Sequence, residues 1–291
     1  MKIINSSDSI EIKSKKILRI SIVTYNTDMN LLRNCLHSIR SSSVASDVFL
    51  IDNSPTCRID EIAREFSCDL VHLAQNPGYG AAHNVALARS LEDGYRYHLV
   101  LNADVSFSSD VLQRIIDFMD TRSEIGHLMP KVLNPDGSTQ NLCKFVPSPI
   151  DLFLRRFIPK IVSSQIKNRF ELRDLDRVSP IFVPYLSGCF MFLRCSALQS
   201  VGFFDERFFM YPEDIDLTRR MAMKYQTIFY PNVSITHEYG GASYKSKKML
   251  LIHTINIIRY FNKWGWIFDR QRTFLNKKTK MLLKNSNFEN Y

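Results

Sequence analysis

Short apolar runs and segments of helical period alternate along the first third of the chain. Ile17 to Thr24, Val48 to Ile51 and Tyr97 to Leu101 are rich in β-branched and aliphatic residues, as in strands that are buried on both faces. Between them, apolar residues recur at every third or fourth position from Leu31 to Arg40 and from Ile59 to Phe66. This alternation predicts an α/β domain with a mainly parallel central sheet.

The pattern is less regular in the second part of the chain. Gly126 to Val132 and Pro184 to Leu193 predict strands, and residues 227–237 predict two further short strands. From Cys143 to Arg177 no period holds, because prolines interrupt a mixture of basic, aromatic and aliphatic residues. We expect this segment to be a long insertion on the substrate side of the domain.

These patterns divide the chain into three parts. Residues 1–16 form a polar N-terminal segment that lacks the apolar core of a signal peptide. Residues 17–244 form the α/β domain, and the regular half of this domain ends near residue 105. Residues 245–291 are expected to form a basic, amphipathic helical tail.

The tail is rich in large apolar side chains. Met249 to Phe268 is apolar at 13 of 20 positions and contains Trp264 and Trp266, although His253 and Lys263 are among the polar residues that interrupt it. A helix that spans a bilayer needs roughly 20 predominantly apolar residues, so this segment is too polar to span. The composition favours an interfacial helix instead.

The tail also carries the whole net charge of +9, because residues 1–240 hold 27 basic and 27 acidic residues while residues 241–291 hold 11 basic and 2 acidic residues. An interfacial helix on an anionic membrane surface explains the apolar and the basic content together. A solvated helix explains only the charge, and a helix packed on the domain explains only the apolar side chains. A nucleic-acid partner is not expected, since the charge-neutral part of the chain carries no nucleic-acid-binding motif.

Six cysteines are scattered along the chain without a CxxC pair. This spacing favours neither a disulfide framework nor a zinc site, and it indicates a reducing compartment. Since no apolar run is long enough to span a bilayer, we expect a cytoplasmic protein.

Three polar residues stand at the ends of predicted strands. Asp52 and Asp104 each follow an apolar strand, and His237 closes the last one. In open α/β sheets, ligands bind outside the carboxyl ends of the strands. There Asp52 can accept the N3–H of a uracil or thymine ring, and Asp104 and His237 can hold a hard divalent ion that bridges two phosphates. The structural alternatives are that Asp52 is a turn residue before Pro55, that Asp104 caps a helix and that His237 has no functional role.

A glycine-bearing loop, Gln75 to Asn84, follows the third predicted strand, Leu70 to Leu73, and leads into a helix of small residues. Gly78-x-Gly80 suggests a dinucleotide-binding turn, but His83 stands at the third glycine position. The loop also follows the third strand rather than the first, so a nicotinamide or flavin site is only a weak match.

The stretch Phe208 to Leu217 places Glu213, Asp214 and Asp216 behind an aromatic run and Pro212. Proline suits the first turn of a helix, and acids in that turn meet the positive end of the helix dipole. The sequence therefore predicts a helix that starts at these acids. Without other evidence, such acids only stabilise the N-terminus of the helix. Beside a sheet edge that binds a ligand, they are candidates for a general base.

The motifs follow one another in a specific order and spacing. They are Val23–Asn26, Ile51–Ser54, Asn76–Gly80 with Asn84, Leu101–Val105, Gly188 with Phe190–Leu193, Gly202–Glu206, Phe209–Leu217, and His237 with Gly240, Gly241 and Ser243. In this order they resemble the GT-A class of inverting, nucleotide-sugar-dependent glycosyltransferases of family 2, and within it the bacterial rhamnosyltransferases of O-antigen and capsule assembly. The resemblance covers about residues 17–245.

The resemblance implies a GT-A, Rossmann-like fold with a nucleotide-binding half at residues 17–105 and an acceptor half at residues 106–244. It implies that Asp52 holds the base and that Asp104 and His237 bind Mg²⁺ or Mn²⁺. Asn102 stands where the family's Asp-x-Asp metal motif has its first acid. The nucleotide-binding residues implied are Thr24, Tyr25, Asn26, Asp52, Asn53, Gly78, Tyr79, Gly80, Asn84, Asn102, Ala103 and Asp104.

The resemblance also implies that Asp214 is the catalytic base and that Glu213 supports it. The Gln-x-x-Arg-Trp motif of processive members is absent after Leu217, so one sugar per encounter is expected. The residues expected on the acceptor side are Gly188, Asp216, Arg219, Arg155 and Arg156.

The expected function is thus that of an inverting, non-processive hexosyltransferase that uses a nucleotide-diphosphate sugar. The expected donor is dTDP-rhamnose, and the expected acceptor is a lipid-linked saccharide at the inner face of the bacterial plasma membrane. A UDP-sugar donor carrying galactofuranose, galactose or N-acetylglucosamine is the alternative within the class. A nucleotide-binding scaffold without activity is the alternative outside it.

Overall fold

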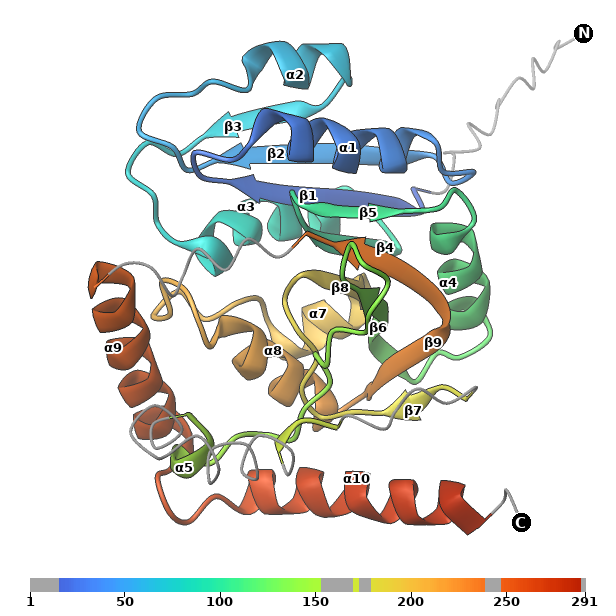
Figure 1. The fold of residues 1–291 in the computed structure, drawn as a ribbon, viewed down its shortest axis with the longest axis vertical. Coiled ribbons are helices and arrows are strands. Elements are labelled where there is room, and N and C mark those ends of the chain that lie inside the picture. Colours follow the sequence, from blue (N-terminus) through green and yellow to red (C-terminus); the bar gives the residue numbers. More distant parts are fainter. Residues whose placement is uncertain (1–15, 153–169, 173–178, 239–246, 289–291) are drawn as a thin grey trace, which may run out of the picture.

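The fold is built around one mixed β-sheet, seen in the computed structural model of Figure 1, which describes residues 16–152, 170–172, 179–238 and 247–288. Within those ranges the sheet has nine strands in the order β3-β2-β1-β4-β8-β6-β9-β5, and β7 pairs with β9 outside this path. The first four strands form the half of the sheet that was predicted most clearly. The predicted α/β fold with a mainly parallel sheet is confirmed.

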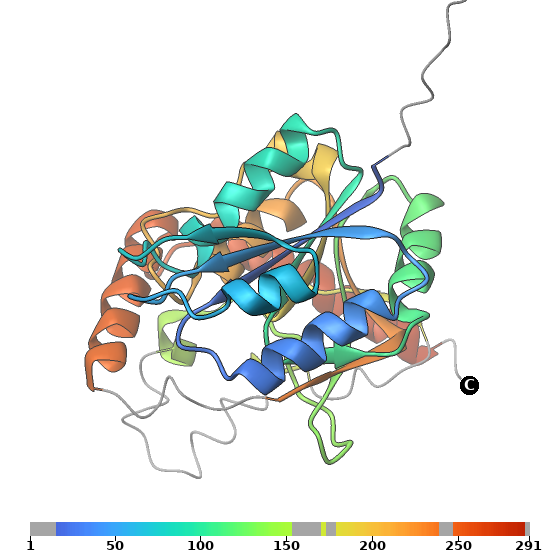
Figure 2. The same cartoon turned by 90° about the horizontal axis from the view of Figure 1, so that it is seen from above.

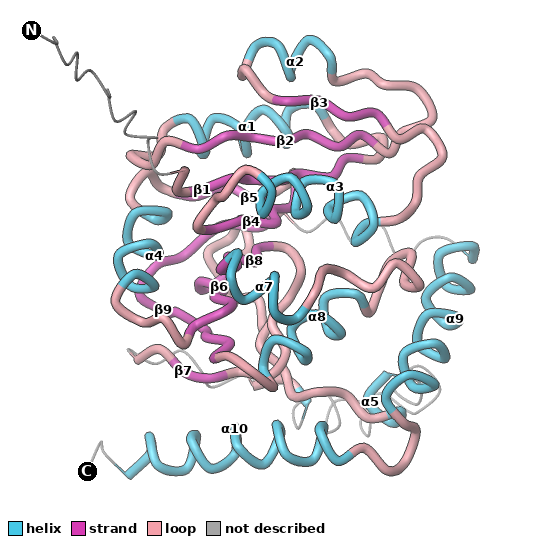
Figure 3. The backbone as a smooth tube through the Cα atoms, turned by 180° about the vertical axis from the view of Figure 1, so that it is seen from behind, coloured by secondary structure: helices cyan, strands magenta, loops and turns pink. Residues whose placement is uncertain are grey.

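The first half is a parallel sheet whose strands are connected by helices. Its elements are β1 (Leu18–Thr24), α1 (Met29–Arg40), β2 (Ser46–Asp52), α2 (Asp60–Glu65), β3 (Asp69–His72), α3 (Tyr79–Glu92) and β4 (Tyr97–Asn102). Strand β1 pairs in parallel with both β2 and β4, which places the carboxyl ends of the three strands at the same edge. Figures 1 and 3, drawn from opposite sides, show α1 on one face of these strands and α3 on the other.

Alternation along β2 explains how the two helices are held. Leu50 packs in the same apolar cluster as Leu36 of α1, while Phe49 and Ile51 pack with Ala82 of α3. Successive side chains of a strand point to opposite faces, so one apolar strand can anchor a helix on each side. Figure 2, seen from above, shows these layers stacked across the sheet.

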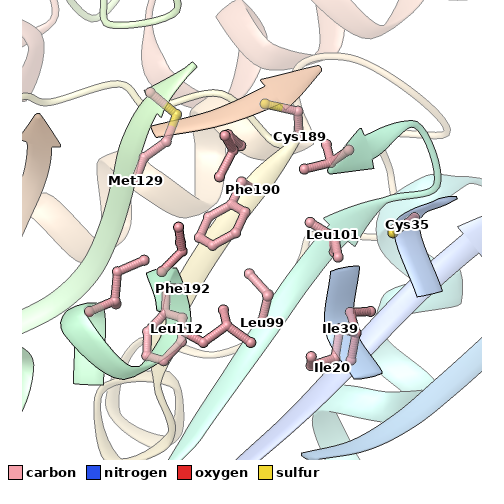
Figure 4. Packing of buried hydrophobic residues seen from close by; sticks show 14 of the residues in the cluster. Ile20, Cys35, Ile39, Leu99, Leu101, Leu112, Met129, Cys189, Phe190 and Phe192 are labelled. Atoms are coloured by element: carbon pink, nitrogen blue, oxygen red, sulfur yellow. The ribbon is translucent and has the colours of Figure 1, made fainter. Parts of the chain in front are cut away.

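The second half is antiparallel at its junction with the first. Its elements are β5 (Val105–Phe107), α4 (Val111–Asp120), β6 (Ile125–Leu133), α5 (Pro149–Leu152), β7 (Ile181–Phe182), β8 (Phe190–Arg194), α7 (Cys195–Val201), α8 (Glu213–Ala222) and β9 (Gln226–His237). Strand β8 lies between β4 and β6 and runs antiparallel to both. Its Phe190 and Phe192 pack with Leu99 and Leu101 of β4 and with Leu112 of α4 in the main core (Figure 4).

Two strand predictions in this half are wrong in detail. Residues 227–237 form one strand, β9, whose pairing with β6 shifts after Tyr230. Pro231 stands at that shift and has no N–H to offer a neighbouring strand. The strand expected from Pro184 to Leu193 begins only at Phe190, because residues 184–188 belong to no strand and the Gly188 N–H bonds Asp214 at the start of α8.

The C-terminal tail is two helices, α9 (Lys247–Trp264) and α10 (Arg270–Phe288), instead of the single helix expected. Gly265 separates them at a φ of 101°, where an added Cβ would lie 2.6 Å from the carbonyl oxygen of Phe268. Ile257 and Tyr260 of α9 are buried against Phe208 and Ile215 of the domain. None of the helices described here is long and apolar enough to cross a bilayer.

A buried ion pair fastens the tail to α8. The Arg219 guanidinium donates to both carboxylate oxygens of Asp269, with side-chain exposures of 0% and 3%. The face of Trp264 lies 4.0 Å from the centre of the same guanidinium. A second contact runs parallel to the first, since Asp216 accepts hydrogen bonds from Lys263 at 2.6 Å and from the Trp264 indole at 2.8 Å.

This pair generates a prediction about stability. Asp269→Ala leaves the Arg219 charge buried without its carboxylate, and we expect the free energy of unfolding to fall by about 3–5 kcal/mol. The measurement is a denaturant titration with far-UV circular dichroism. Glu65→Ala is the matched control, because Glu65 pairs with Arg33 at side-chain exposures of 43% and 37%. That pair is exposed, so its loss is expected to cost less than about 1 kcal/mol. Equal losses in the two variants would contradict the structural role of the buried pair.

Candidate active site

The candidate site lies at the carboxyl edge of the parallel strands. Thr24 pairs with Asp52 in the register of β1 and β2, and Val23 pairs with Asn102 in the register of β1 and β4. The sheet therefore brings Asp52 and Asn102, which are far apart in the sequence, to the same edge. The strand-end placement expected from the sequence is confirmed.

Asp52 is a buried carboxylate with one oxygen satisfied and one left over. Its Oδ1 accepts hydrogen bonds from the Thr24 hydroxyl at 2.9 Å and from the Ser54 hydroxyl at 2.7 Å. Its Oδ2 has no hydrogen-bond partner among the described residues, although the side chain is only 1% exposed. A buried acceptor without a donor is costly, so this oxygen is suited to a ligand N–H. Thr24 is itself buried, so its contribution to a nucleotide site is to orient Asp52.

The residues around Asp52 shape the rest of the edge. Tyr25 is 53% exposed beside it, and the Asn26 backbone N–H donates to the Ser54 hydroxyl at 2.8 Å. The Asn53 amide donates to the Asn76 side chain at 3.2 Å, which ties the end of β2 to the glycine-bearing loop. Tyr25 thus offers an accessible aromatic ring at the end of β1, one residue after the partner of Asp52 in the sheet.

The two glycines of the loop allow the two halves of the domain to touch. Gly78 has a φ of 104°, and a Cβ added there would lie 2.3 Å from the carbonyl oxygen of Phe209. The Tyr79 N–H donates to that same oxygen at 2.9 Å. A Cβ at Gly80 would lie 2.8 Å from Cβ of Phe204. Any side chain at either glycine would therefore push residues 204–209, and the start of α8 behind them, away from the loop.

Asn84 has a structural role in place of the predicted nucleotide contact. Its amide donates to the Phe204 carbonyl at 3.0 Å and to Glu206 at 2.9 Å, and its carbonyl accepts the Phe204 N–H at 3.0 Å. Both donors of the amide are thus engaged in holding the 204–206 loop on α3. Gly80, which packs against that loop, serves the same contact.

Asp104 and His237 lie together, as the metal prediction requires. Strand β5 pairs with β9 so that Val105 faces His237, and His237 Nε2 lies 3.3 Å from Asp104 Oδ1. The Gln140 side-chain oxygen lies 3.0 Å from His237 Nδ1 and the Gln140 amide donates to the His237 carbonyl at 2.7 Å. This contact holds the Nδ1 proton and leaves the Nε2 lone pair on the side of Asp104.

A divalent ion fits this pair only if other ligands complete its shell. A carboxylate and an imidazole suit Mg²⁺ or Mn²⁺, but no group of three or more His, Cys, Asp or Glu residues that could hold a metal occurs among the described residues. The remaining ligands would have to be phosphate oxygens and water. Asn102 is oriented away from this role, because its oxygen accepts from the Tyr79 hydroxyl at 2.9 Å and its amide nitrogen faces His237 at 3.4 Å.

Asp214 stands at the start of α8 with hydrogen-bond donors directed at it. Its Oδ2 accepts from the Gly188 N–H at 3.0 Å and lies 3.4 Å from the Tyr185 hydroxyl. A Cβ at Gly188 would lie 3.2 Å from the Asp214 Cβ, so the close approach depends on glycine. Burial raises the pKa of Asp214, while these donors and the nearby charge of Lys144 oppose that rise.

Glu213 lies beside Asp214 in a different environment. It is 5% exposed, and its Oε2 has no hydrogen-bond partner among the described residues. Burial, and then the neighbouring charge of Asp214, raise the pKa of Glu213 well above its usual range. The donors favour ionisation of Asp214, whereas at Glu213 burial outweighs the backbone hydrogen bonds and favours the protonated form. The two carboxyls are thereby assigned different protonation states, as in other acid–base pairs.

One hydroxyl connects the strand edge with the start of α8. The Tyr79 hydroxyl lies 2.9 Å from the Asn102 side-chain oxygen and 2.9 Å from the Gly188 carbonyl oxygen. Burial raises the pKa of Tyr79 well above its usual range, so it stays a neutral donor. Asn102 and Gly188, and with Gly188 the Asp214 carboxylate, therefore belong to one site.

The predicted acceptor-side residues have different outcomes. Gly188 lies beside Asp214, as described above. Asp216 and Arg219 are 0% exposed and pair with the tail, so their expected acceptor contacts are corrected to structural ones. They follow Asp214 on a helix that is covered by α9, and only the first turn of that helix meets the site. Arg155 and Arg156 lie outside the described residues.

Three residues that contribute to the site were not expected from the sequence. Tyr185 and Lys144 face Asp214, and Gln140 orients His237. Each lies far along the chain from its partner, and Tyr185 falls in a segment that was expected to be a strand. An isolated Tyr, Lys or Gln carries no local signal, so only the fold reveals these contacts.

Comparison with known proteins places this geometry in a known group. Residues 20–202 match the family described as Glycosyl transferase family 2. The chain is 28% identical over 236 residues to the N-acetylglucosaminyl-diphospho-decaprenol L-rhamnosyltransferase of Mycobacterium tuberculosis, covering 76% of each chain. It is 23% identical over 283 residues to the Rhamnosyltransferase WbbL of Escherichia coli K12, covering 93% of this chain and 96% of that one.

A solved structure shares the fold at lower identity. The mannosyltransferase PcManGT from Pyrobaculum calidifontis, in complex with GDP-Man and Mn²⁺, superposes with a TM-score of 0.56 at 17% identity. The match covers 83% of this chain and 64% of that chain, so this chain spans slightly less than two thirds of the archaeal protein. At this identity the likeness concerns the fold alone.

The environment of Glu213 generates a prediction about pH. Its raised pKa means that the folded state keeps a proton which the unfolded chain releases near pH 4–5, so the stability it contributes is present at acidic pH and is lost as pH rises through the folded-state pKa. Glu213→Gln stays neutral throughout. We expect its free energy of unfolding to exceed that of the wild type above the folded-state pKa and to converge with it at acidic pH.

Denaturant titrations at a series of pH values measure this difference. Glu206→Gln, a change at a residue on the loop surface, controls for the loss of any acid and is expected to leave the pH dependence unaltered. Identical pH dependence in wild type and Glu213→Gln would show that folding does not raise the pKa of Glu213.

Proposed function

The chain belongs to glycosyltransferase family 2 and has the GT-A fold, and from this we propose that it transfers rhamnose from dTDP-rhamnose to a lipid-linked saccharide. As a member of that family it is a nucleotide-sugar-dependent glycosyltransferase. The observation that carries the proposal is the partly buried Asp214 carboxylate, held by the Gly188 N–H in the same site as the strand-edge acids.

The nucleotide would bind at the strand edge. The unpaired Oδ2 of Asp52 would accept the N3–H of the thymine or uracil ring, and the exposed Tyr25 ring would stack on it. Thr24 and Ser54 keep the Asp52 carboxylate in place during binding. Thymine and uracil offer the same N3–H, so this contact selects pyrimidine bases of that type without separating the two.

Asp104 and His237 would hold a divalent metal on the diphosphate. When bound, such an ion supplies positive charge that stabilises the leaving nucleoside diphosphate. Gln140 fixes the His237 ring so that Nε2 faces Asp104. Asn102, with its oxygen engaged by Tyr79, positions the loop between the strand edge and the metal ligands.

Asp214 would act as general base. The acceptor hydroxyl gives its proton to the Asp214 carboxylate while its oxygen forms the new bond to the anomeric carbon, and the bond from that carbon to the diphosphate breaks. Attack on the face opposite the leaving group inverts the anomeric centre. Burial raises the pKa of Asp214 toward the working pH, which strengthens it as a base. Glu213, kept protonated, adds no second negative charge to the site.

Two relatives support rhamnose as the sugar. Both carry rhamnosyltransferase in their names, and one of them covers nearly the full length of this chain. The name of the mycobacterial relative describes an acceptor on diphospho-decaprenol. We therefore propose a lipid-linked acceptor for this chain, and hence work as a peripheral protein at the inner face of the bacterial plasma membrane. A UDP-sugar donor remains the alternative, since Asp52 accepts uracil equally well.

The donor proposal is tested by release of the nucleoside diphosphate from a panel of dTDP-, UDP- and GDP-sugars with Mg²⁺. We expect dTDP release from dTDP-rhamnose, its loss with EDTA, and its restoration by Mg²⁺ or Mn²⁺. Asp104→Ala should abolish release, whereas Asp151→Ala, at an acid of α5 away from the strand edge, should leave it unchanged. Turnover of UDP-sugars alone would show that the donor is a UDP-sugar and not dTDP-rhamnose. Full activity in EDTA would contradict the metal site.

The role of Asp214 is tested by Asp214→Asn. The amide keeps the size of the side chain but cannot take the proton, so we expect kcat to fall at least about 10²-fold with donor binding largely retained. Glu213→Gln should cost less, because the proposed Glu213 is already neutral. The measurements are steady-state turnover and donor titration by calorimetry. Near-wild-type turnover of Asp214→Asn would assign the base to another residue.

A further inference from the structure

The bend between α9 and α10 and the outward side of α10 expose apolar and cationic residues together. Ile267 and Phe268 in the bend are 77% and 92% exposed, and Phe274 and Met281 of α10 are 57% and 56% exposed. We call this surface the tail face. Its exposed cations are Arg270, Lys277 and Lys284.

The α10 residues of the tail face lie on one side of the helix. Their positions, at residues 270, 274, 277, 281 and 284, recur every three or four residues, which is the spacing of a single helical face. The opposite side of α10 packs on the domain, where Leu275 and Thr279 are 0% exposed. The Asn276 side chain exchanges two hydrogen bonds with the backbone of Val146 there. Figure 1 shows α10 along an outer edge of the molecule.

The tail face has the charge of a surface that meets anions. Residues 241–291 hold 11 basic and 2 acidic residues. One of the two acids, Asp269, is committed to Arg219. Two copies meeting through this face would bring Lys277 and Lys284 against the same cations of the partner, which is unfavourable. The interleaving of cations with apolar side chains on one helical face is typical of interfacial helices.

We propose that the tail face docks on an anionic lipid bilayer. Ile267, Phe268 and the apolar side chains of α10 enter the boundary between headgroups and acyl chains, and the cations contact lipid phosphates. This inference deepens the proposed function and rests on it for the reason to approach a membrane, namely a lipid-linked acceptor.

The docking surface differs from the one expected from sequence. Residues 249–268 were predicted as the interfacial helix, but Trp264 donates its indole N–H to Asp216 and its ring lies against Arg219. Ile257 and Tyr260 of α9 are likewise buried. The outer side of α9 exposes Leu250, Leu251, Ile255 and Ile258 at 39–61%. We place the lipid contact at the bend and α10, where exposed cations share one helical face with the apolar side chains. Phe268 directly precedes Asp269, so the docked bend is adjacent to the ion pair that holds α8.

Vesicle binding by the full chain tests this proposal without donor or acceptor, so its result does not depend on the proposed activity. We expect co-sedimentation with phosphatidylglycerol-containing vesicles at low salt, release as salt rises, and little binding to pure phosphatidylcholine. Lys277→Glu with Lys284→Glu should weaken partitioning by well over tenfold, at about fivefold or more per cation. Ile267→Ser with Phe268→Ser should also abolish binding.

A matched control separates the tail face from α9. Leu251 of α9 is 61% exposed, so Leu251→Ser removes a comparable apolar side chain from the other tail helix. We expect it to bind vesicles as the wild type does. Loss of binding in Leu251→Ser with binding retained in the Ile267→Ser, Phe268→Ser variant would overturn the proposal in favour of α9. Far-UV circular dichroism of each variant verifies that the chain is folded.

Tryptophan fluorescence gives a second readout at the bend. The chain has 2 tryptophans, and Trp266, which is 40% exposed, adjoins Ile267. We expect brominated phosphatidylglycerol vesicles to quench part of the fluorescence, and Trp266→Phe to remove the quenched part. Absence of quenching, or a dimer in light scattering that the Ile267→Ser, Phe268→Ser variant abolishes, would show that the tail face does not enter lipid.

Discussion

The site depends on two adjacent carboxyls, those of Glu213 and Asp214, which are removed from water at the start of α8. An ionised carboxylate taken out of water is costly unless donors replace its hydration. Asp214 receives the Gly188 N–H and faces the Tyr185 hydroxyl, while Glu213 keeps a buried oxygen without a described partner. Two acids of neighbouring sequence thus acquire different protonation states from their surroundings. A fixed, partly desolvated carboxylate is what a general base for an alcohol requires.

The start of α8 is held from two sides by distant parts of the chain. On one side, the Tyr79 N–H bonds the Phe209 carbonyl across a contact that only glycine at position 78 permits. On the other side, Asp269 of the tail holds Arg219 of the same helix. The tail is therefore part of the support for the candidate base as well as a candidate membrane contact. Such preorganisation by packed neighbours is what keeps a catalytic group in position.

The parts of the site that the sequence predicted share a local cause. Asp52 and Asp104 follow apolar strands, and parallel strands must end at one edge, so the pattern alone located them. Acids and Pro212 mark a helix start, which located the group of acids, and the family resemblance selected Asp214 among them. Gln140 and Tyr185 were missed because their partners, His237 and Asp214, lie far away in the sequence and only the fold brings them together. Arg219 was misplaced because a charge on a helix is ordinarily solvated, and nothing near it in sequence announces Asp269.

The pH dependence of kcat tests the central claim, that Asp214 is the base and has a raised pKa, most directly. With donor and acceptor saturating, the account predicts that log kcat falls with unit slope as pH decreases, with a midpoint clearly above the value of about 3.9 for an ordinary aspartate. The sign follows from the chemistry, because protonated Asp214 cannot accept a proton and its buried site favours the protonated form. A kcat that stays constant down to pH 4 in a protein that remains folded would contradict the account.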